Sequence, residues 1–154
     1  MSELTEGQKA PDFTSKDQSG NTVSLNQFAG KKVVLYFYPK DDTPGCTAEA
    51  CSFRDNYQGL KAQGIEVLGV SVDDEKSHQK FIAKHNLPFT LLADIDKQIV
   101  EAYGVWGEKN MYGKKYMGIT RSTFLIDEQG VISHIIKKVD TANATEQVLE
   151  LLTL

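Results

Sequence analysis

An apolar run that ends at a proline and leads directly into a helix start limits this chain to few folds. Residues 33–38 read Val-Val-Leu-Tyr-Phe-Tyr, and a short run of β-branched and aromatic residues predicts a buried strand. Pro39 must end that strand, because proline cannot donate a hydrogen bond to a neighbouring strand. Thr43 is a favourable N-cap, and Pro44 suits the first helical position. We therefore expect a strand–loop–helix unit with Cys46 in the first turn of the helix.

Cys46 is predicted to be a reactive nucleophile. The first turn of a helix has unpaired backbone N–H groups and the positive end of the helix dipole, and both favour a thiolate over a thiol. The alternative is a structural thiol, because free cysteines are common in protein cores. A cysteine directly after Thr43-Pro44-Gly45 is not typical of a core position, so we favour the reactive interpretation.

Cys51 lies five residues after Cys46 on the same expected helix. At 100° per residue the two side chains point about 140° apart, with a rise of about 7.5 Å, so their Cα atoms are roughly 8.7 Å apart. Disulfides usually span about 4.4–6.8 Å between Cα atoms. The two thiols cannot bond while the helix is intact, so either no disulfide forms or the helix opens. A pair that is separate when reduced and joined after oxidation suits a peroxide-reducing thiol cycle, whereas the alternative is an unreactive Cys51 on the helix face.

These residues carry a resemblance to a known family. Pro39-x-x-x-Thr43-x-x-Cys46 resembles the active-site motif of peroxiredoxins, and the step to Cys51 resembles the bacterioferritin-comigratory-protein branch, also called peroxiredoxin Q. The resemblance implies a thiol peroxidase that reduces hydrogen peroxide and organic hydroperoxides and protects against oxidative stress. It implies a sulfenic acid on Cys46 that Cys51 resolves as an intramolecular disulfide, and thioredoxin or a similar dithiol protein as reductant. We expect no cofactor and no metal.

The resemblance also assigns roles to three further residues. The Thr43 hydroxyl would hold the substrate oxygen, Arg121 would hold thiolate and peroxide with its fork of donors, and Pro39 would shield the sulfenate from water. Arg121 begins a stretch, residues 121–127, that resembles the Arg-x-x-Phe-x-x-Asp pattern of the family. Simpler interpretations are open for each: Thr43 as a helix cap, Arg121 as a surface arginine at a strand start, and Pro39 as the end of a strand.

Strands and helices alternate along the sequence. We expect strands at residues 14–16, 22–24, 32–38, 65–72, 90–93, 121–126 and 131–136, and helices at 24–28, 44–62, 75–85, 97–103 and 141–152. Residues 104–118, which are rich in glycine and aromatic residues, are predicted to be a long loop. Alternation of this kind predicts an α/β fold with a partly parallel sheet. Together with the resemblance it implies a thioredoxin-like fold: a central mixed sheet flanked by helices, with an N-terminal β-hairpin extension.

Length and charge limit the remaining possibilities. A chain of 154 residues without a repeat or a linker suits a single domain, residues 1–154. A net charge of −4 argues against a nucleic acid or an anionic membrane as the main partner. The N-terminus has no cationic start or apolar segment and there is no run of about 18 apolar residues, so we expect a cytoplasmic protein. Resolution within one chain needs no second subunit, which allows a monomer.

Other ionisable residues fit no further site. Glu49, on the same helix as Cys46, could relay a proton, but we interpret it as a solvated helix charge. His78, His85 and His134 are isolated in the sequence and with two cysteines do not form a zinc spacing, so we expect surface residues. Asp73 is interpreted as part of a helix cap.

Two other functions are weighed against the peroxidase. A thiol–disulfide oxidoreductase acting on proteins usually has a Cys-x-x-Cys pair, whereas four residues separate Cys46 and Cys51. A peroxide sensor, which passes its oxidation to a partner protein, would use the same two cysteines without steady turnover.

Overall fold

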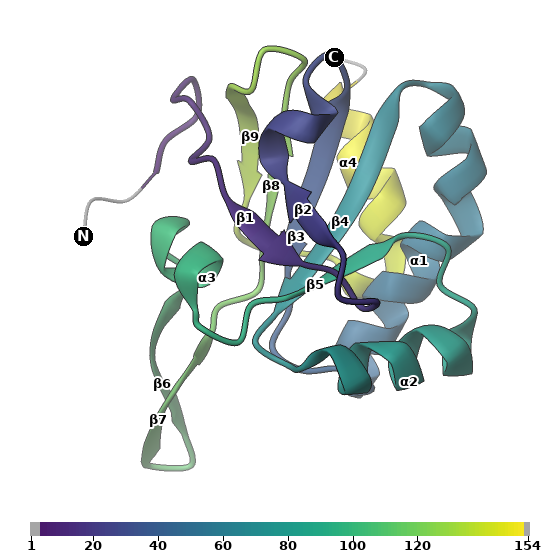
Figure 1. Ribbon diagram of the computed structural model, residues 1–154. Coiled ribbons are helices and arrows are strands. Elements are labelled where there is room, and N and C mark those ends of the chain that lie inside the picture. The colour runs from purple at the N-terminus through teal and green to yellow at the C-terminus, as the bar shows by residue number, and fades with distance from the viewer. Residues whose placement is uncertain (1–3, 153–154) are drawn as a thin grey trace.

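A five-stranded mixed sheet forms the centre of the computed structural model, which describes residues 4–152 (Figure 1). The strand order is β5-β4-β3-β8-β9. Strand β3 runs parallel to β4, and β4 runs parallel to β5, whereas β8 runs antiparallel to both β3 and β9. Helices flank the sheet, and β1 and β2 form a separate hairpin near the N-terminus. The predicted mixed sheet and N-terminal hairpin are confirmed.

The elements follow one another as the alternation of the sequence predicts. The strands are β1 (Thr14–Lys16), β2 (Thr22–Ser24), β3 (Lys32–Phe37), β4 (Ile65–Ser71), β5 (Thr90–Ala93), β6 (Trp106–Met111), β7 (Lys114–Ile119), β8 (Ser122–Ile126) and β9 (Ile132–Ile136). The helices are α1 (Pro44–Ala62), α2 (Glu75–His85), α3 (Gln98–Ala102) and α4 (Ala144–Leu152), with short 3-10 turns η1 (Leu25–Phe28) and η2 (Thr141–Asn143). Among residues 4–152, no helix combines the length and the apolar character that crossing a membrane requires.

Strand β3 shows why the sheet is covered on both faces. Successive side chains of a strand point to opposite faces, and all of its side chains from Val33 to Phe37 are buried. Leu35 and Phe37 pack in one apolar cluster, and Val34 and Tyr36 in the other. A central strand that is apolar on both faces requires a layer on each side.

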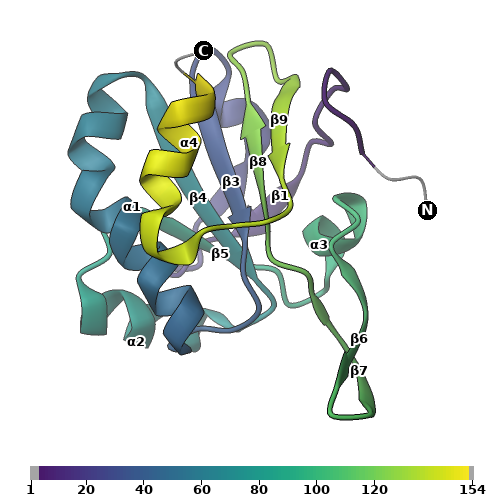
Figure 2. The ribbon, with the colours of Figure 1, turned by 180° about the vertical axis from the view of Figure 1, so that it is seen from behind.

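The two covering layers differ in composition. Side chains of α1, α2 and α4 fill one cluster, and Figure 2 shows α1 and α4 lying in front of the sheet. Side chains of α3 and of the N-terminal segment with β1 and β2 fill the other cluster, on the opposite face of the sheet. Helix α1 therefore packs along β3 and β4, and its first turn lies beyond the carboxyl end of β3.

Helix α1 has the bounds that the sequence predicts. Pro44 is its first residue, as expected, and Gln63 is its C-cap, followed by Gly64 with a φ of +76°. Glycine adopts this left-handed conformation without a steric penalty, so it ends the helix. The helix is continuous over 19 residues and includes both cysteines.

The prediction of a long loop at residues 104–118 is wrong. Strands β6 and β7 pair in register from Trp106↔Ile119 to Met111↔Lys114 and form a hairpin that projects from the body (Figure 1). Its turn residues Tyr112 and Gly113 have φ values of +54° and +81°, as two-residue hairpin turns require. The alternation of apolar and polar residues is weak here because most side chains of the hairpin face solvent.

Other differences are confined to element ends. The expected helix at residues 141–152 begins as η2 and continues as α4, and the expected helix at residues 24–28 is a 3-10 turn. Arg121 lies just before β8 rather than in it. These differences do not change the topology.

Two glycines give a test of the packing between β4, β5 and β3. A Cβ on Gly69 would lie 2.7 Å from Leu91 Cδ2 and 2.8 Å from Tyr36 Cζ, whereas a Cβ on Gly59, on the exposed side of α1, would meet nothing within 4 Å. We expect Gly69→Ala to destabilise the fold by about 1–3 kcal/mol through overpacking. Gly59→Ala should stabilise it by about 1 kcal/mol through helix propensity. Urea unfolding measures both, and equal effects of the same sign would contradict this packing.

Candidate active site

The candidate site lies beyond the carboxyl end of β3, where the chain turns into α1. Cys46 is the third residue of α1, and only 1% of its surface is exposed. Because Pro44 has no N–H, the N–H groups of Gly45 and Cys46 are those in the first turn that lack an acceptor within the helix. These amides and the helix dipole favour negative charge at this end of α1.

Arg121 connects the sulfur to a buried carboxylate. Its Nη2 donates to Cys46 Sγ at 3.3 Å, and its Nη1 donates to Glu49 Oε1 at 2.7 Å. Cys46 and Glu49 are three residues apart on α1 and so share one side of the helix. The planar guanidinium reaches both because its donors are arranged as a rigid fork.

The register of the sheet brings Arg121 to this position. Strand β8 pairs with β3 through Phe37↔Ser122, so Arg121 leaves the sheet at the same end as the chain that leads into α1. Gly45 leaves room for the guanidinium, because a Cβ at Gly45 would lie 3.2 Å from Arg121 Nη2. The contact with Cys46 thus depends on a strand register and on a missing side chain.

Glu49 is not the solvated charge that the sequence analysis expected. The residue is fully buried, and its Oε2 accepts no hydrogen bond from any residue between 4 and 152. Burial raises the pKa of Glu49 to about 7, although the charge and hydrogen bond of Arg121 act in the opposite direction. Burial also acts against the positive charge of Arg121 and would lower its pKa. The charges and hydrogen bonds of Glu49 and Cys46 outweigh this effect and raise the pKa of Arg121. The guanidinium is therefore always charged, whereas Glu49 changes charge near neutral pH.

Thr43 and Pro39 border the loop in front of Cys46. Thr43 occupies the N-cap position, but its hydroxyl donates to the Lys40 carbonyl at 2.9 Å instead of capping the helix. Pro39 directly follows the buried Tyr38 and is half-buried. The structure thus brings together Cys46, Arg121 and Glu49, with the Thr43 hydroxyl turned back toward the loop.

Cys51 lies on the same unbroken helix as Cys46 and is partly exposed. Both cysteines are free thiols in this structure. With α1 continuous across them, their Cα atoms are roughly 8.7 Å apart by helix geometry. The structure therefore has the arrangement in which the two sulfurs cannot bond.

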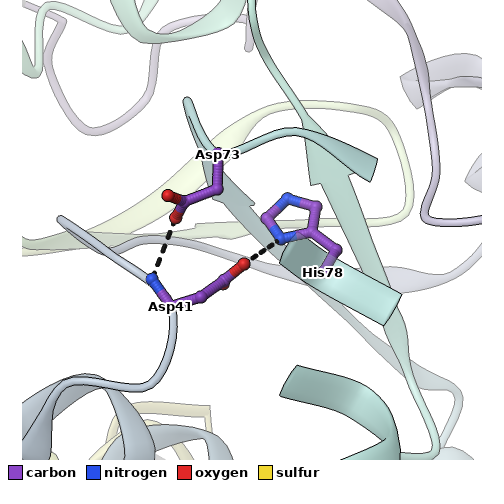
Figure 3. Close-up of side chains that lie close together, drawn as sticks. All are labelled: Asp41, Asp73 and His78. Carbon is purple, nitrogen blue, oxygen red and sulfur yellow. Dashed lines mark hydrogen bonds and ion pairs between the residues drawn. The ribbon is translucent and has the colours of Figure 1, made fainter. Parts of the chain in front are cut away.

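A second, largely buried cluster is made of Asp41, which belongs to the loop before α1, with Asp73 and His78 (Figure 3). The expectation that His78 is a surface residue is wrong, because none of it is exposed. His78 Nδ1 lies 2.7 Å from Asp41 Oδ2, and Asp73 Oδ2 accepts the Asp41 N–H at 2.9 Å. A metal ion would need the lone pair of Nδ1, but this nitrogen faces a carboxylate oxygen at hydrogen-bond distance. The cluster therefore fits a hydrogen-bond network better than a metal site.

Sequence reasoning missed Glu49 and His78 as parts of this region. Glu49 stands three residues after Cys46, and this helical spacing was the one available signal. For His78 no local signal exists, because its partner Asp41 is 37 residues away.

Comparisons with known proteins identify the family that this chain resembles. Residues 6–135 match the AhpC/TSA family. A relative from Coxiella burnetii is 56% identical over 143 residues, which are 93% of this chain and 95% of the relative. Peroxiredoxin Bcp of Escherichia coli K12 is 48% identical over 149 residues, 97% of this chain and 96% of that protein.

A solved structure of a related protein has the same fold, and its description names a reaction of that protein. The bacterioferritin comigratory protein of Xanthomonas campestris superimposes with a TM-score of 0.85 at 40% identity, covering 92% of this chain and 90% of that chain. That structure is described in terms of alkyl peroxide reduction and trapped intermediate and ligand complexes. The likeness confirms the thioredoxin-like fold that the sequence predicted.

The buried Glu49 predicts a pH-dependent stability. A carboxyl whose pKa rises from 4.5 to about 7 on folding keeps its proton longer in the folded state, so stability falls as pH rises from 4.5 to 7. The decline attributable to Glu49 is about 3 kcal/mol, at about 1.4 kcal/mol per pH unit. Glu49→Gln should remove this part of the decline, measured by urea unfolding between those pH values. Glu101→Gln, an exposed change on α3, should follow the parent protein, and parallel slopes for all three proteins would refute the assignment.

Proposed function

The chain belongs to the AhpC/TSA family, and from this premise we propose that Cys46 is the sulfur that attacks peroxide. The protein is a peroxiredoxin, a thiol peroxidase. The observation that carries the assignment to Cys46 is its place in the first turn of α1, with Arg121 Nη2 3.3 Å from its sulfur. A nucleophile needs its anionic form, and both features favour the thiolate.

The proposed first step is a displacement on the O–O bond. The Cys46 thiolate attacks one peroxide oxygen, a new S–O bond forms, and the O–O bond breaks with its electron pair leaving on the distal oxygen. Cys46 becomes a sulfenic acid, and the leaving oxygen takes a proton to become water or an alcohol. Negative charge thus moves from sulfur to oxygen along the line of attack, and donors already in place along that line stabilise the transition state.

Four residues have proposed roles in that step. Arg121 would donate to the sulfur and then to the leaving oxygen, while Glu49 holds the guanidinium in orientation. The Thr43 hydroxyl, which donates to the Lys40 carbonyl without substrate, would turn to bind the substrate oxygen. Pro39 would shield the sulfenate from water. The first-turn N–H groups supply further donors toward the developing charge.

Cys51 is the proposed resolving thiol. Its sulfur would attack the Cys46 sulfenic acid, form the S–S bond and release water. This step requires the start of α1 to unwind, because the intact helix holds the two Cα atoms too far apart. A dithiol protein would then reduce the disulfide by exchange and become oxidised itself. Resolution within one chain allows the protein to act as a monomer of one domain, residues 1–154.

The proposed substrates are hydrogen peroxide and organic hydroperoxides, and the proposed reductant is thioredoxin. The alkyl peroxide reduction described for the Xanthomonas campestris relative supports the organic substrates. The proposed place of action is the cytoplasm. No cofactor is proposed, since sulfur chemistry accounts for each step. A peroxide sensor is the alternative function, and it would undergo the same first two steps without turnover.

Cysteine variants test the two sulfur assignments. Cys46→Ser should abolish peroxide reduction, because the alcohol is not ionised at neutral pH. Cys51→Ser should keep the rapid first step, measured by stopped flow, but stop after one equivalent of peroxide. Mass spectrometry under non-reducing conditions should show the loss of two hydrogens in the parent protein and not in either variant. A Cys46→Ser protein that still consumes peroxide would refute the assignment.

Turnover separates the peroxidase from the sensor. With thioredoxin, thioredoxin reductase and NADPH, the parent protein should consume many equivalents of peroxide. Oxidation that stops after one equivalent in this mixture would favour the sensor.

Arginine variants test the guanidinium. Arg121→Ala should lower the second-order rate constant with peroxide by about 10²–10³-fold, the effect of losing a donor aimed at developing charge. Arg121→Lys should be intermediate, since it keeps the charge but cannot reach Cys46 and Glu49 together. The matched control is Arg54→Ala, which removes the chain's other arginine, located on α1. A parent-like rate in Arg121→Ala would remove Arg121 from the site.

A further inference from the structure

The buried histidine of α2 has an acceptor in front of each ring nitrogen. His78 Nδ1 lies 2.7 Å from Asp41 Oδ2, and its Nε2 lies 2.9 Å from the Leu92 carbonyl oxygen of β5. A carbonyl oxygen can only accept a hydrogen bond. The Asp41 carboxylate accepts as well, because it also receives the hydroxyl hydrogens of Tyr38 and Ser77 at 2.5 and 2.8 Å.

With Asp41 as a carboxylate, this geometry favours an imidazolium at His78. A neutral ring has one N–H and one lone pair, so either tautomer would point a lone pair at a buried acceptor. With both nitrogens protonated, each donates to an acceptor, and the positive charge is paired with the carboxylate. His78 and Asp41 thus form a buried ion pair, with exposed side-chain fractions of 0% and 3%.

The charges around the ring agree with this state. Burial alone would lower the pKa of His78, but the hydrogen bond and charge of Asp41, the Leu92 carbonyl and the charge of Asp73 outweigh it and raise the pKa above 6.5. Asp41 faces the ring from the loop after β3, and Asp73 from the loop after β4. From β3 the ring faces the neutral Tyr38. The ion pair is therefore present at and below pH 6.5 and is lost as pH rises through the pKa of folded His78.

Asp41 is part of the loop before Cys46, so its ion pair with His78 also holds this loop in place. Its N–H donates to Asp73, and its carboxylate is held by His78, Ser77 and Tyr38, so both its backbone and its side chain are fixed. The next residue, Asp42, has a φ of +60°, a left-handed conformation that aspartate adopts more readily than most residues other than glycine. Thr43 then donates to the Lys40 carbonyl and begins α1. The loop is thus a tight turn anchored at the buried Asp41.

We propose that the His78 imidazolium is a positioning residue for Cys46: by holding Asp41, it keeps the loop of residues 39–43 and the first turn of α1 in the conformation that attacks peroxide. This inference rests on the proposed function and deepens it. His78 itself contacts neither the sulfur nor Arg121 among its hydrogen bonds; it acts through Asp41. Loss of its charge should loosen the loop that starts the reactive helix.

A loosened loop should affect the two chemical steps in opposite directions. Attack on peroxide needs Cys46 and the loop in one fixed geometry, and a small displacement of reacting groups is costly. Disulfide formation needs the same turn of α1 to unwind. Neutral His78 should therefore slow the oxidation of Cys46 and speed its bonding to Cys51. A role of His78 in global stability alone would not slow the first step in protein that remains folded.

Stopped-flow kinetics of both steps, measured from pH 6 to 9, test this division. At neutral pH, His78→Leu should oxidise on the order of tenfold more slowly than the parent protein, with faster disulfide formation. In Asp41→Asn, a neutral His78 can accept a hydrogen bond from the amide and donate one to the Leu92 carbonyl, so this variant should fold. Its oxidation rate should lack the pH dependence that is due to His78. The control His134→Gln, on β9, should match the parent. Oxidation by His78→Leu at the parent rate would overturn the proposal.

A second measurement does not depend on activity. The ¹⁵N and ¹³C chemical shifts of the His78 ring should report an imidazolium at pH 6.5 that titrates above this value, and Asp41→Asn should lower that titration. A neutral ring at pH 6.5 in the parent protein would overturn the proposal, even if His78→Leu fails to fold. If the parent protein consumes no peroxide, the proposed function fails instead, and the ring titration still reports on the ion pair.

Discussion

The contact between Arg121 and Cys46 joins two elements that are far apart in the sequence, and the rest of the site is arranged around it. The guanidinium stands at the start of β8, and the sulfur stands in the first turn of α1. They meet because β3 and β8 pair through Phe37↔Ser122, which fixes where both chains leave the sheet. A one-residue change of register would turn the buried side chains of β8 to the wrong faces. The core that stabilises the sheet therefore also sets the distance on which the chemistry depends.

In the proposed cycle, helix α1 must be both rigid and able to open. Its later turns are anchored by Ala50, Phe53 and Leu60, which are fully buried or nearly so against the sheet. Its first turn buries Cys46 and is otherwise held by Asp41 in the loop before it and by Arg121, which precedes β8. The start of the helix can therefore separate while the apolar contacts of the later turns remain. Such a division suits the proposed cycle, in which Cys46 attacks peroxide while the helix is intact and then bonds to Cys51 after the first turn unwinds.

Local signals in the sequence predict most of the fold and part of the site. Thr43 and Pro44 mark the start of α1, and the bounds of α1, α2 and β5 agree with the expected ones, because caps and prolines act on their own neighbours. The β6–β7 hairpin was missed because its strands lack an apolar face, and only the turn at Gly113 marks it. Burial of Glu49 could not be predicted, because it depends on Arg121, 72 residues away. A charged residue in the core is determined by its partner and not by its neighbours in sequence.

Two ion pairs, each with a buried carboxylate, thus border the first turn of α1, and they respond to pH in opposite senses. Rising pH charges Glu49, whose pKa is about 7, and completes its pairing with Arg121. His78 has a raised pKa, so it loses its proton only at higher pH. When it does, its ion pair with Asp41 is lost and Asp41 is held less firmly. Burying either pair costs desolvation free energy that apolar side chains would not require. Stability alone does not account for such pairs. The proposed cycle does, because it needs the turn held while Cys46 attacks peroxide and released while Cys46 bonds to Cys51.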